Sequence, residues 1–214
     1  MSQRDEVMRE IGEAKLVAVI RSKAEQVVPI VAALIEGGVK AMEITFSVPR
    51  APEMIAETLK HFGGQLLLGA GTVLQPQQAE DAIAAGARFI VAPNTNFDVI
   101  RLCNQRDVPV MPGALTPTEI AAAWQGGADC VKLFPAETVG IAYLKAIRAP
   151  MPDIPIMPTG GVDTGNAAEW LRAGAFALGV GSQLVSRDAV TYGRYDQIAT
   201  LAREFLAAIA KAKT

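Results

Sequence analysis

The sequence predicts an α/β fold, a single (β/α)8 barrel with an additional N-terminal helix, in which residues 1–214 form one domain. Eight short apolar segments recur along the chain at the spacing of one strand-plus-helix unit. Alanine-rich helical stretches separate them, and several of these stretches stop at glycine. Alternating strands and helices indicate a parallel sheet, and eight units in sequence favour its closure into a barrel.

A helix is expected first, over residues 1–15. Val7, Met8 and Ile11 have the spacing of an amphipathic helix and not the pattern of a signal peptide. We expect this helix to cap one end of the barrel.

The strands are expected at the short apolar runs, which are residues 16–21, 40–46, 66–71, 89–93, 108–113, 129–135, 154–160 and 177–182. An open, doubly wound sheet is the alternative architecture. It would usually carry a Gly-x-Gly-x-x-Gly turn after its first strand, whereas Arg21-Ser22-Lys23 follows here. The closed barrel is therefore favoured.

Helices between the strands are marked by alanine and by the glycines that end them. Clear examples are residues 77–85, 117–124 and 166–172, and residues 195–212 are expected to form the last helix. Glycine supplies the left-handed backbone that stops a helix before the next strand. The stops are Gly37-Gly38, Gly86, Gly126-Gly127 and Gly174.

Composition excludes several classes of function. A net charge of -2 with scattered basic residues predicts no nucleic-acid partner. The apolar runs are far shorter than the roughly 20 residues that span a bilayer, so no membrane association is predicted. Cys103 and Cys130 form no Cys-x-x-Cys motif and suit a reducing compartment, which predicts the cytoplasm. Because His61 is the only histidine, we expect no metal site, and no cofactor is predicted.

Two charged residues fall on strand faces that point into the barrel, because side chains alternate along a strand. In the strand 40–46, Met42 and Ile44 form an apolar face for the helices, which leaves Glu43 pointing inward. The same parity turns Lys132 inward from the strand 129–135. Both residues lie close to the C-terminal ends of their strands, where barrel enzymes have their active sites.

Burial of this lysine predicts its chemistry. A lysine in an apolar strand loses hydration, which lowers its pKa and leaves the neutral amine that attacks a carbonyl carbon. Glu43 can form an ion pair with Lys132, accept its proton or shuttle protons for it. A structural salt bridge is the alternative, although charges inside a barrel are costly. Arg21, at the end of the first strand, is either a clamp for a substrate carboxylate or a solvated loop charge.

Glycine turns at the ends of the last two strands predict an anion site. Thr159-Gly160-Gly161 and Gly179-Val180-Gly181-Ser182 let backbone N–H groups approach a phosphate. A short helix beginning after Ser182 would add its dipole. Tight turns without a ligand are the alternative. After the third strand, Gly69-Ala70-Gly71-Thr72 is expected to grip the carboxylate of a keto acid.

With these residues the sequence resembles the 2-keto-3-deoxy-6-phosphogluconate (KDPG) and 4-hydroxy-2-oxoglutarate (KHG) aldolases over nearly the whole chain. The motifs that carry the resemblance are Glu43-Ile44-Thr45-Phe46-Ser47-Val48-Pro49, Gly69-Ala70-Gly71-Thr72-Val73, Met111-Pro112-Gly113, Val131-Lys132-Leu133-Phe134-Pro135 and Pro158-Thr159-Gly160-Gly161.

This resemblance implies a class I aldolase of carbohydrate metabolism, in the Entner–Doudoroff pathway. The reaction it implies is reversible cleavage of KDPG to pyruvate and D-glyceraldehyde 3-phosphate, or of KHG to pyruvate and glyoxylate. It implies Lys132 as the Schiff-base lysine, Glu43 as the general acid–base, and a homotrimer. The substrate-binding residues that it implies are Thr72 beside the pyruvate, Pro93 and Phe134 in the pocket wall, Thr159 against the polyol, and Gly160, Gly161 and Ser182 around the phosphate.

The chain departs from the family pattern at Ser47, where some members carry an arginine for the pyruvate carboxylate. Arg21 is the candidate for that task. Pro93-Asn94 resembles the sister enzymes for the galactonate epimer, whereas Thr159 resembles the gluconate type, so KDPG is favoured and its epimer is the alternative. Another phosphate-binding barrel enzyme, such as an epimerase or a synthase, and a non-catalytic sugar-phosphate-binding barrel are further alternatives.

Overall fold

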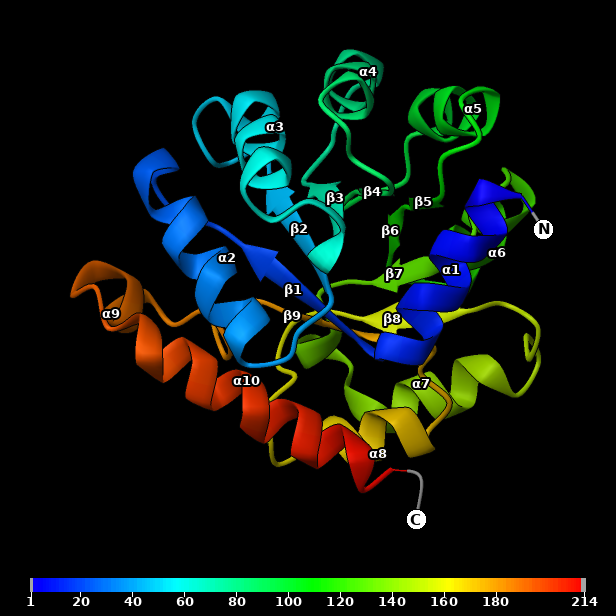
Figure 1. Cartoon of the computed structure of the whole chain (residues 1–214). Helices are drawn as coiled ribbons and strands as arrows, with labels where there is room; N and C mark the ends of the chain where they lie inside the picture. The colour runs from blue at the N-terminus through cyan, green and yellow to red at the C-terminus, as the bar shows by residue number, and fades with distance from the viewer. Residues whose placement is uncertain (1, 213–214) are drawn as a thin grey trace.

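The computed structural model describes residues 2–212, whose strands form a curved parallel arrangement surrounded by helices (Figure 1). Every strand pairing is parallel. Parallel neighbours need crossover connections, and helices provide them along the chain. The protein therefore has an α/β fold, as the alternation of apolar and alanine-rich segments predicts.

The strands are β1 (Leu16–Ile20), β2 (Ala41–Thr45), β3 (Leu67–Gly71), β4 (Ile90–Val91), β5 (Val110–Met111), β6 (Gly113–Ala114), β7 (Val131–Leu133), β8 (Ile156–Pro158) and β9 (Leu178–Val180). Each predicted strand overlaps an observed one but is longer. The prediction of one strand over residues 108–113 is wrong, because Pro112 separates β5 from β6. Proline has no N–H to donate to a β-ladder.

Strand order follows the chain in two sheets. One sheet has the order β5-β4-β3-β2-β1-β9, and the other has the order β6-β7-β8. Backbone contacts also link the two sheets: the N–H of Asp129 donates to the carbonyl of Val110 at 3.0 Å, and Thr159 forms a parallel bridge to Gly179. Because all strands run the same way, their C-terminal ends lie together at one end of the molecule.

The α-helices are α1 (Gln3–Ala14), α2 (Val27–Glu36), α3 (Ala51–Phe62), α4 (Pro76–Ala84), α5 (Phe97–Gln105), α6 (Pro117–Gln125), α7 (Gly140–Arg148), α8 (Ala167–Arg172), α9 (Arg187–Thr191) and α10 (Tyr195–Ala210). Short 3-10 turns are η1 (Ala24–Gln26), η2 (Gly63–Gln65) and η3 (Ala136–Thr138). The predicted helices 77–85, 117–124, 166–172 and 195–212 correspond to α4, α6, α8 and α10 within one or two residues at each end. The predicted glycine helix ends are confirmed at Gly38 and Gly86, whose backbone is left-handed with φ of 91° and 102°.

Residue parity separates an inner from an outer core, as predicted. Met42 and Ile44 pack with the helices, whereas Ala41 belongs to a second cluster inside the strands. The inner cluster consists of Val17, Ala41, Leu67, Phe89, Val91, Met111, Cys130, Met157 and Ala177, with Val7 and Ile11 from α1. Alternating side chains thus send one set under the helices and the other to the interior.

Helix α1 covers the interior at the N-terminal end of the strands (Figure 1). Ser2 and Asp5 form a capping box that starts the helix. Val7 and Ile11 are fully buried, and burial of each such side chain contributes about 1.5–3 kcal/mol. Arg4 donates to Asp129 from Nη2 at 2.7 Å, and Asp129 also accepts from the N–H of Val110 at 2.7 Å. The helix is therefore tied to the residues just before β7.

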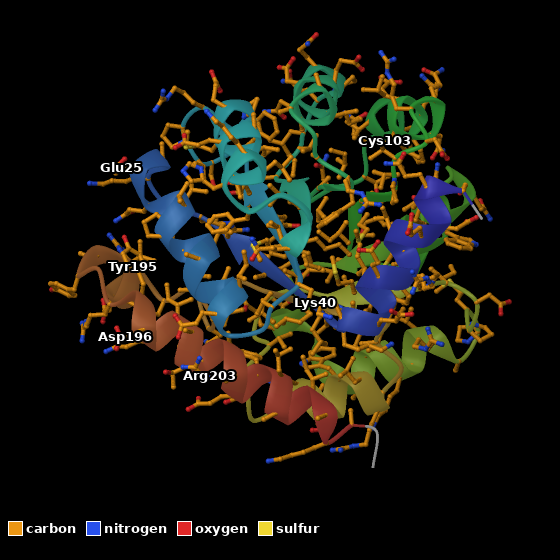
Figure 2. All side chains as sticks on the ribbon, in the orientation of Figure 1. Glu25, Lys40, Cys103, Tyr195, Asp196 and Arg203 are labelled. Carbon is orange, nitrogen blue, oxygen red and sulfur yellow. The ribbon has the colours of Figure 1, made fainter. Side chains whose placement is uncertain are left out.

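Charged side chains project from the outer faces of the helices, among them Glu25, Asp196 and Arg203 (Figure 2). No helix within residues 2–212 combines the length and the hydropathy that a membrane span requires.

Candidate active site

Glu43 and Lys132 lie inside the strands, as parity predicts. Glu43 is the central residue of β2 and Lys132 the central residue of β7. Each is only 1% exposed. The residues adjacent to them in each strand face the helices, so both side chains point to the interior. The sequence-based prediction of two inward charged residues is confirmed by their positions.

The carboxylate of Glu43 is buried without a hydrogen-bond partner. Neither Oε1 nor Oε2 accepts a hydrogen bond from any residue between 2 and 212, and Lys132 forms no ion pair with it. Space for the carboxylate comes from Gly71, where a Cβ would lie 2.3 Å from Oε1. An unpartnered buried carboxylate destabilises a fold, so a direct structural salt bridge does not explain why Glu43 is there.

Burial shifts the pKa of both groups toward their neutral forms. Desolvation lowers the pKa of Lys132, the charge of Glu43 raises it, and Arg21 lowers it again, with a net decrease. Desolvation likewise raises the pKa of Glu43, against the opposing charges of Lys132 and Arg21. A lysine with a lowered pKa supplies a neutral, nucleophilic amine, and a carboxylate with a raised pKa can exchange protons near neutral pH.

Phe134 forms a wall next to the lysine. The Nζ of Lys132 lies 5.2 Å from the centroid of the Phe134 ring. At this distance the π face of the ring would stabilise a positive charge on Nζ. Phe134 also faces the neighbouring cavity, so it connects the buried pair with the open end of the site.

A cavity of about 240 Å³ brings most of the predicted substrate-binding residues together at the C-terminal ends of the strands. We call it the glycine cavity. The predicted residues that line it are Arg21, Phe134, Thr159, Gly160, Gly161, Gly181 and Ser182. Gly160 and Gly161 have left-handed φ values of 99° and 70°, which glycine adopts without strain. The two glycine turns predicted as an anion site therefore do face a common space.

Thr159 presents a free hydroxyl in this region. Its Oγ1 is buried and has no hydrogen-bond partner within residues 2–212. Gly179 makes room for it, since a Cβ there would lie 2.2 Å from that oxygen. A buried hydroxyl without a partner is costly unless a ligand supplies one.

Two of the predicted substrate-binding residues lie outside the glycine cavity, and the buried Glu43 and Lys132 do not line it either. Thr72 follows β3 with a left-handed φ of 57° and does not line it. Pro93 lines a neighbouring cavity of about 390 Å³, which shares Phe134 with the glycine cavity. The predicted helix directly after Ser182 is also absent, because α9 begins at Arg187 with Ser186 as its cap. Residues 183–185 turn first, so no helix dipole starts at Ser182.

The sequence-based prediction missed Glu137, which lines the glycine cavity opposite the glycines. Its position two residues after Pro135 places it in the turn that follows β7, at the functional end of the strands. That location was the available signal, but residue periodicity does not describe the path of a turn.

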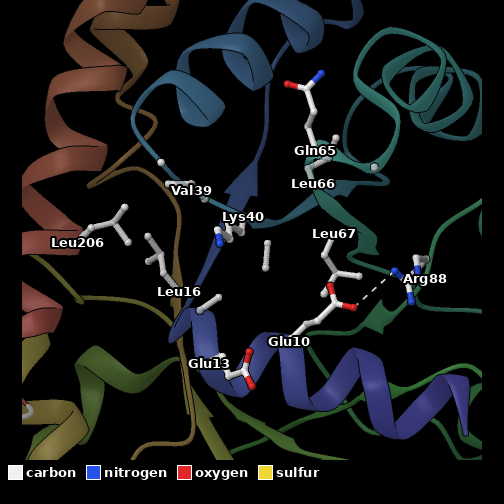
Figure 3. Close-up of a pocket in the computed structure, with 14 residues that line it drawn as sticks. Glu10, Glu13, Leu16, Val39, Lys40, Gln65, Leu66, Leu67, Arg88 and Leu206 are labelled. Carbon is white, nitrogen blue, oxygen red and sulfur yellow. Dashed lines mark ion pairs between the residues drawn. The ribbon is translucent and has the colours of Figure 1, made fainter.

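A wider cavity, of about 440 Å³, lies at the opposite end of the strands (Figure 3). Its walls combine apolar residues with charges, and Glu10 forms an ion pair with Arg88 at 3.7 Å. None of the predicted site residues lines it. In parallel α/β folds ligands bind at the C-terminal ends of the strands, so we take the glycine cavity as the candidate active site despite its smaller volume.

Metal ligands and reactive thiols do not stand out in the described part of the chain. Residues 2–212 contain no group of three or more His, Cys, Asp or Glu side chains arranged to hold a metal ion. Both cysteines are free and buried, and burial raises the pKa of Cys103 to about 12, which keeps it a thiol.

The parallel α/β fold and the buried amine–carboxylate pair define an enzyme suited to carbonyl chemistry. Residues 6–201 match the family model described as KDPG and KHG aldolase. The chain belongs to the KDPG and KHG aldolase family. The family resemblance seen in the sequence motifs is thus confirmed.

Individual relatives are similar over most of their length. The 2-dehydro-3-deoxy-phosphogluconate aldolase of Treponema pallidum is 38% identical over 86% of this chain and 88% of the relative. The 2-dehydro-3-deoxy-6-phosphogalactonate aldolase of Escherichia coli is 36% identical over 79% of this chain and 83% of the relative. A crystal structure of KDPG aldolase from Legionella pneumophila, with pyruvate captured as a covalent carbinolamine intermediate, has a TM-score of 0.82 at 30% identity, covering 90% of this chain and 96% of that one.

Proposed function

We propose that the protein is a class I aldolase that reversibly cleaves KDPG to pyruvate and D-glyceraldehyde 3-phosphate, with Lys132 as the Schiff-base residue. The observation that carries the proposal is the buried Lys132 amine, whose pKa is lowered, on the same interior as an unpartnered Glu43 carboxylate. The relative with a captured pyruvate carbinolamine supports the same chemistry.

In this mechanism the neutral amine of Lys132 adds to the C2 carbonyl of the keto acid. Loss of one water molecule gives an iminium that withdraws electrons from C3. Glu43, through a water, takes the proton of the C4 hydroxyl as the C3–C4 bond breaks, which releases the aldehyde and leaves an enamine. Glu43 then returns a proton to C3, and hydrolysis by water frees pyruvate and the amine. One carboxylate can serve both proton transfers because the two reacting atoms lie above the same face of the iminium.

The open end of the site is assigned to the substrate's other groups. Gly160, Gly161, Gly181 and Ser182 are proposed to surround the phosphate, and the partnerless hydroxyl of Thr159 to meet the polyol. Thr72 and Arg21 are proposed to hold the pyruvate carboxylate, and Pro93 to line the wall with Phe134.

Ser47 leaves the carboxylate task to other residues. Its Oγ lies 2.6 Å from Oγ1 of Thr45, which in turn donates to the carbonyl of Ile20. The Ser47 hydroxyl is engaged in these hydrogen bonds and cannot replace an arginine, whose guanidinium binds a carboxylate at two points. Arg21 lines the cavity and lowers the pKa of Glu43 and Lys132 by its charge, which supports its proposed role near the reacting groups.

We also propose that residues 1–214 form one domain in which the strands close into a full (β/α)8 barrel, with β5 and β6 counted as one strand and α1 across its N-terminal end. The backbone links from Asp129 to Val110 and from Thr159 to Gly179 support closure. The family resemblance supports a homotrimer, and the two free, buried cysteines support a place in the cytoplasm. Sedimentation analysis of the purified protein tests the trimer.

The galactonate-type relative favours a second candidate substrate, 2-keto-3-deoxy-6-phosphogalactonate. It differs from KDPG only in the configuration of one hydroxyl, so the Lys132 chemistry is unchanged. Assays of both phosphorylated keto acids side by side decide between them, and KHG is assayed in the same series.

Borohydride reduction in the presence of pyruvate tests the Schiff base. We expect a covalent pyruvate adduct that mass mapping locates on Lys132. Absence of an adduct there would refute the aldolase mechanism and would favour a barrel that binds sugar phosphates without catalysis.

A further inference from the structure

The wider cavity at the N-terminal ends of the strands has no part in the proposed aldolase reaction. Its volume of about 440 Å³ lies within the range of roughly 300–1,000 Å³ that sites for small molecules occupy. Helices α1 and α10 and the first residues of β1, β2 and β3 surround it (Figure 3). We call it the basal cavity. It shares no lining residue with the glycine cavity, so a molecule bound there would not occupy the substrate site.

Apolar side chains form the inner wall of the basal cavity. Leu16, Ala41 and Leu67 begin three neighbouring strands, and each is at most 3% exposed. Leu206 adds apolar surface from α10, on the side of the cavity away from Arg88 (Figure 3). Such a wall favours the hydrocarbon part of a ligand, because contact removes apolar surface from water on both molecules.

Lys40 brings a positive charge to this cavity without a carboxylate partner. The residue directly precedes β2 and is exposed, and its side chain forms no ion pair with any residue between 2 and 212. Figure 3 shows Lys40 between Leu16 and Leu67, next to the apolar wall. An ammonium group in this position attracts an anionic group whose apolar remainder contacts the leucines.

Arg88 supplies a second cation that keeps hydrogen-bond donors for a ligand. Its ion pairs with Glu6 and Glu10, at 3.9 Å and 3.7 Å, are longer than the about 2.7–3.2 Å of an N–H···O hydrogen bond. The guanidinium can therefore still donate two parallel bonds to a carboxylate. Lys40 and Arg88 stand before β2 and β4 with β3 between them, so their backbones are roughly 10 Å apart and their long side chains can reach one anion.

The carboxylates that line the basal cavity already have cationic partners. Glu10 pairs with Arg88, and Oε1 of Glu13 accepts a hydrogen bond from Nη1 of Arg9 at 2.8 Å. Of the charged residues that line the cavity, Lys40 alone lacks an ion pair within residues 2–212, which leaves capacity for one negative charge. A multiply charged anion is disfavoured, because the two glutamates repel it.

We propose that the basal cavity is a second binding site, for a small aliphatic carboxylate that carries a single negative charge. The carboxylate binds between Lys40 and Arg88, and the hydrocarbon chain packs against Leu16, Leu67 and Leu206. This site is independent of the chemistry of the strands' other end, since it uses none of the residues assigned to the aldolase reaction.

Isothermal titration calorimetry with three probes tests the two halves of the site. Octanoate carries both a carboxylate and an apolar chain, octan-1-ol lacks the charge, and acetate lacks the chain. Octanoate should bind at one site, and the other two probes at least about tenfold more weakly, because each loses one set of contacts. Equal affinity for octan-1-ol or for acetate, or no binding of octanoate at millimolar concentration, would overturn the proposal.

Replacement of Lys40 locates the bound carboxylate. Lys40→Met keeps an unbranched apolar side chain and removes the charge, so it should weaken octanoate binding about tenfold and leave the binding of octan-1-ol unchanged. Lys145→Met is the matched control, because Lys145 is an exposed lysine on α7 that does not line the basal cavity. Parental octanoate affinity in Lys40→Met, with the fold verified by circular dichroism, or an equal loss in Lys145→Met, would refute the assignment.

Competition with pyruvate distinguishes the basal cavity from the substrate site. The affinity for octanoate should be the same with and without excess pyruvate, and octanoate should not compete with KDPG in steady-state cleavage, because the two cavities share no residue. Displacement of octanoate by pyruvate would place it at the C-terminal ends of the strands and would contradict the proposal.

Discussion

The two ends of the strands carry cavities that differ in how their polar groups are satisfied. At the N-terminal end, Glu10 is paired with Arg88 and the wall is built on buried apolar side chains. At the C-terminal end, Glu43 and Thr159 keep buried oxygens without partners. The C-terminal end therefore holds buried polar groups that a ligand could satisfy. Unsatisfied buried polarity, and not cavity volume, is the reason for choosing this end as the candidate active site.

Replacement of Lys132 should give the largest loss of activity, and it tests whether the two ends of the strands differ in function. Lys132→Ala removes the amine that forms the iminium, and we expect a fall in kcat of about 10⁴-fold or more. Lys40→Ala is the matched control, because Lys40 lines the opposite cavity. Steady-state aldol cleavage of KDPG measures both. Comparable losses in the two variants would show that the ends are not functionally distinct.

Replacement of Glu43 should separate proton transfer from binding. Glu43→Gln should slow the exchange of pyruvate methyl protons by about 10²–10³-fold, the usual contribution of a positioned acid–base group. Borohydride trapping of pyruvate on Lys132 should persist, because the amine is intact. The exchange is followed by NMR. If the methyl protons exchange at the parental rate in Glu43→Gln, Glu43 is not the acid–base.

Truncation at the other end should affect stability and spare the chemistry. Ile11→Ala leaves a hole where a fully buried side chain of α1 packs on the inner cluster. We expect a loss of about 2–4 kcal/mol in the free energy of unfolding, measured by urea denaturation. When Ile11→Ala is assayed well below its melting temperature, its kcat should stay near the parental value. A large fall in kcat there would mean that α1 takes part in catalysis.

The pH dependence of stability should report the unpartnered carboxylate. The pKa of Glu43 is raised in the folded protein above its ordinary value of 4.5, so between these two values the folded state binds more protons. The contribution of Glu43 is therefore most favourable below pH 4.5 and is lost as the pH rises through the folded pKa. Glu43→Gln should unfold at a higher temperature than the parent at pH 7, by roughly 1 kcal/mol of stability, and the difference should shrink toward pH 4. Thermal melts across this range measure it, and a parent that is the more stable protein at pH 7 contradicts the assignment.

Strand parity explains why the centre of the site could be predicted. Strand geometry fixes a period of two residues. The apolar residues Met42 and Val131 were therefore sufficient to predict that Glu43 and Lys132 point inward. The same reasoning could not divide the strand 108–113, where one missing N–H at Pro112 interrupts the ladder.

Turns set the limit of prediction at the edge of the site. The helix expected after Ser182 begins at Arg187 instead, and Glu137 reaches the glycines from another turn. Such positions depend on the direction that a loop takes after its strand, which residue composition does not determine.

The contact of Arg4 with Asp129 connects helix α1 to the strand that carries Lys132. Asp129 stands three residues before Lys132, a span of about 10 Å in an extended strand. Arg4 of helix α1 donates to Asp129, and Asp129 accepts from the N–H of Val110. These contacts fix the position of the residues that precede β7. The Arg4–Asp129 contact at the N-terminal end of the strands therefore helps to set the position of Lys132, although Arg4 does not line the glycine cavity.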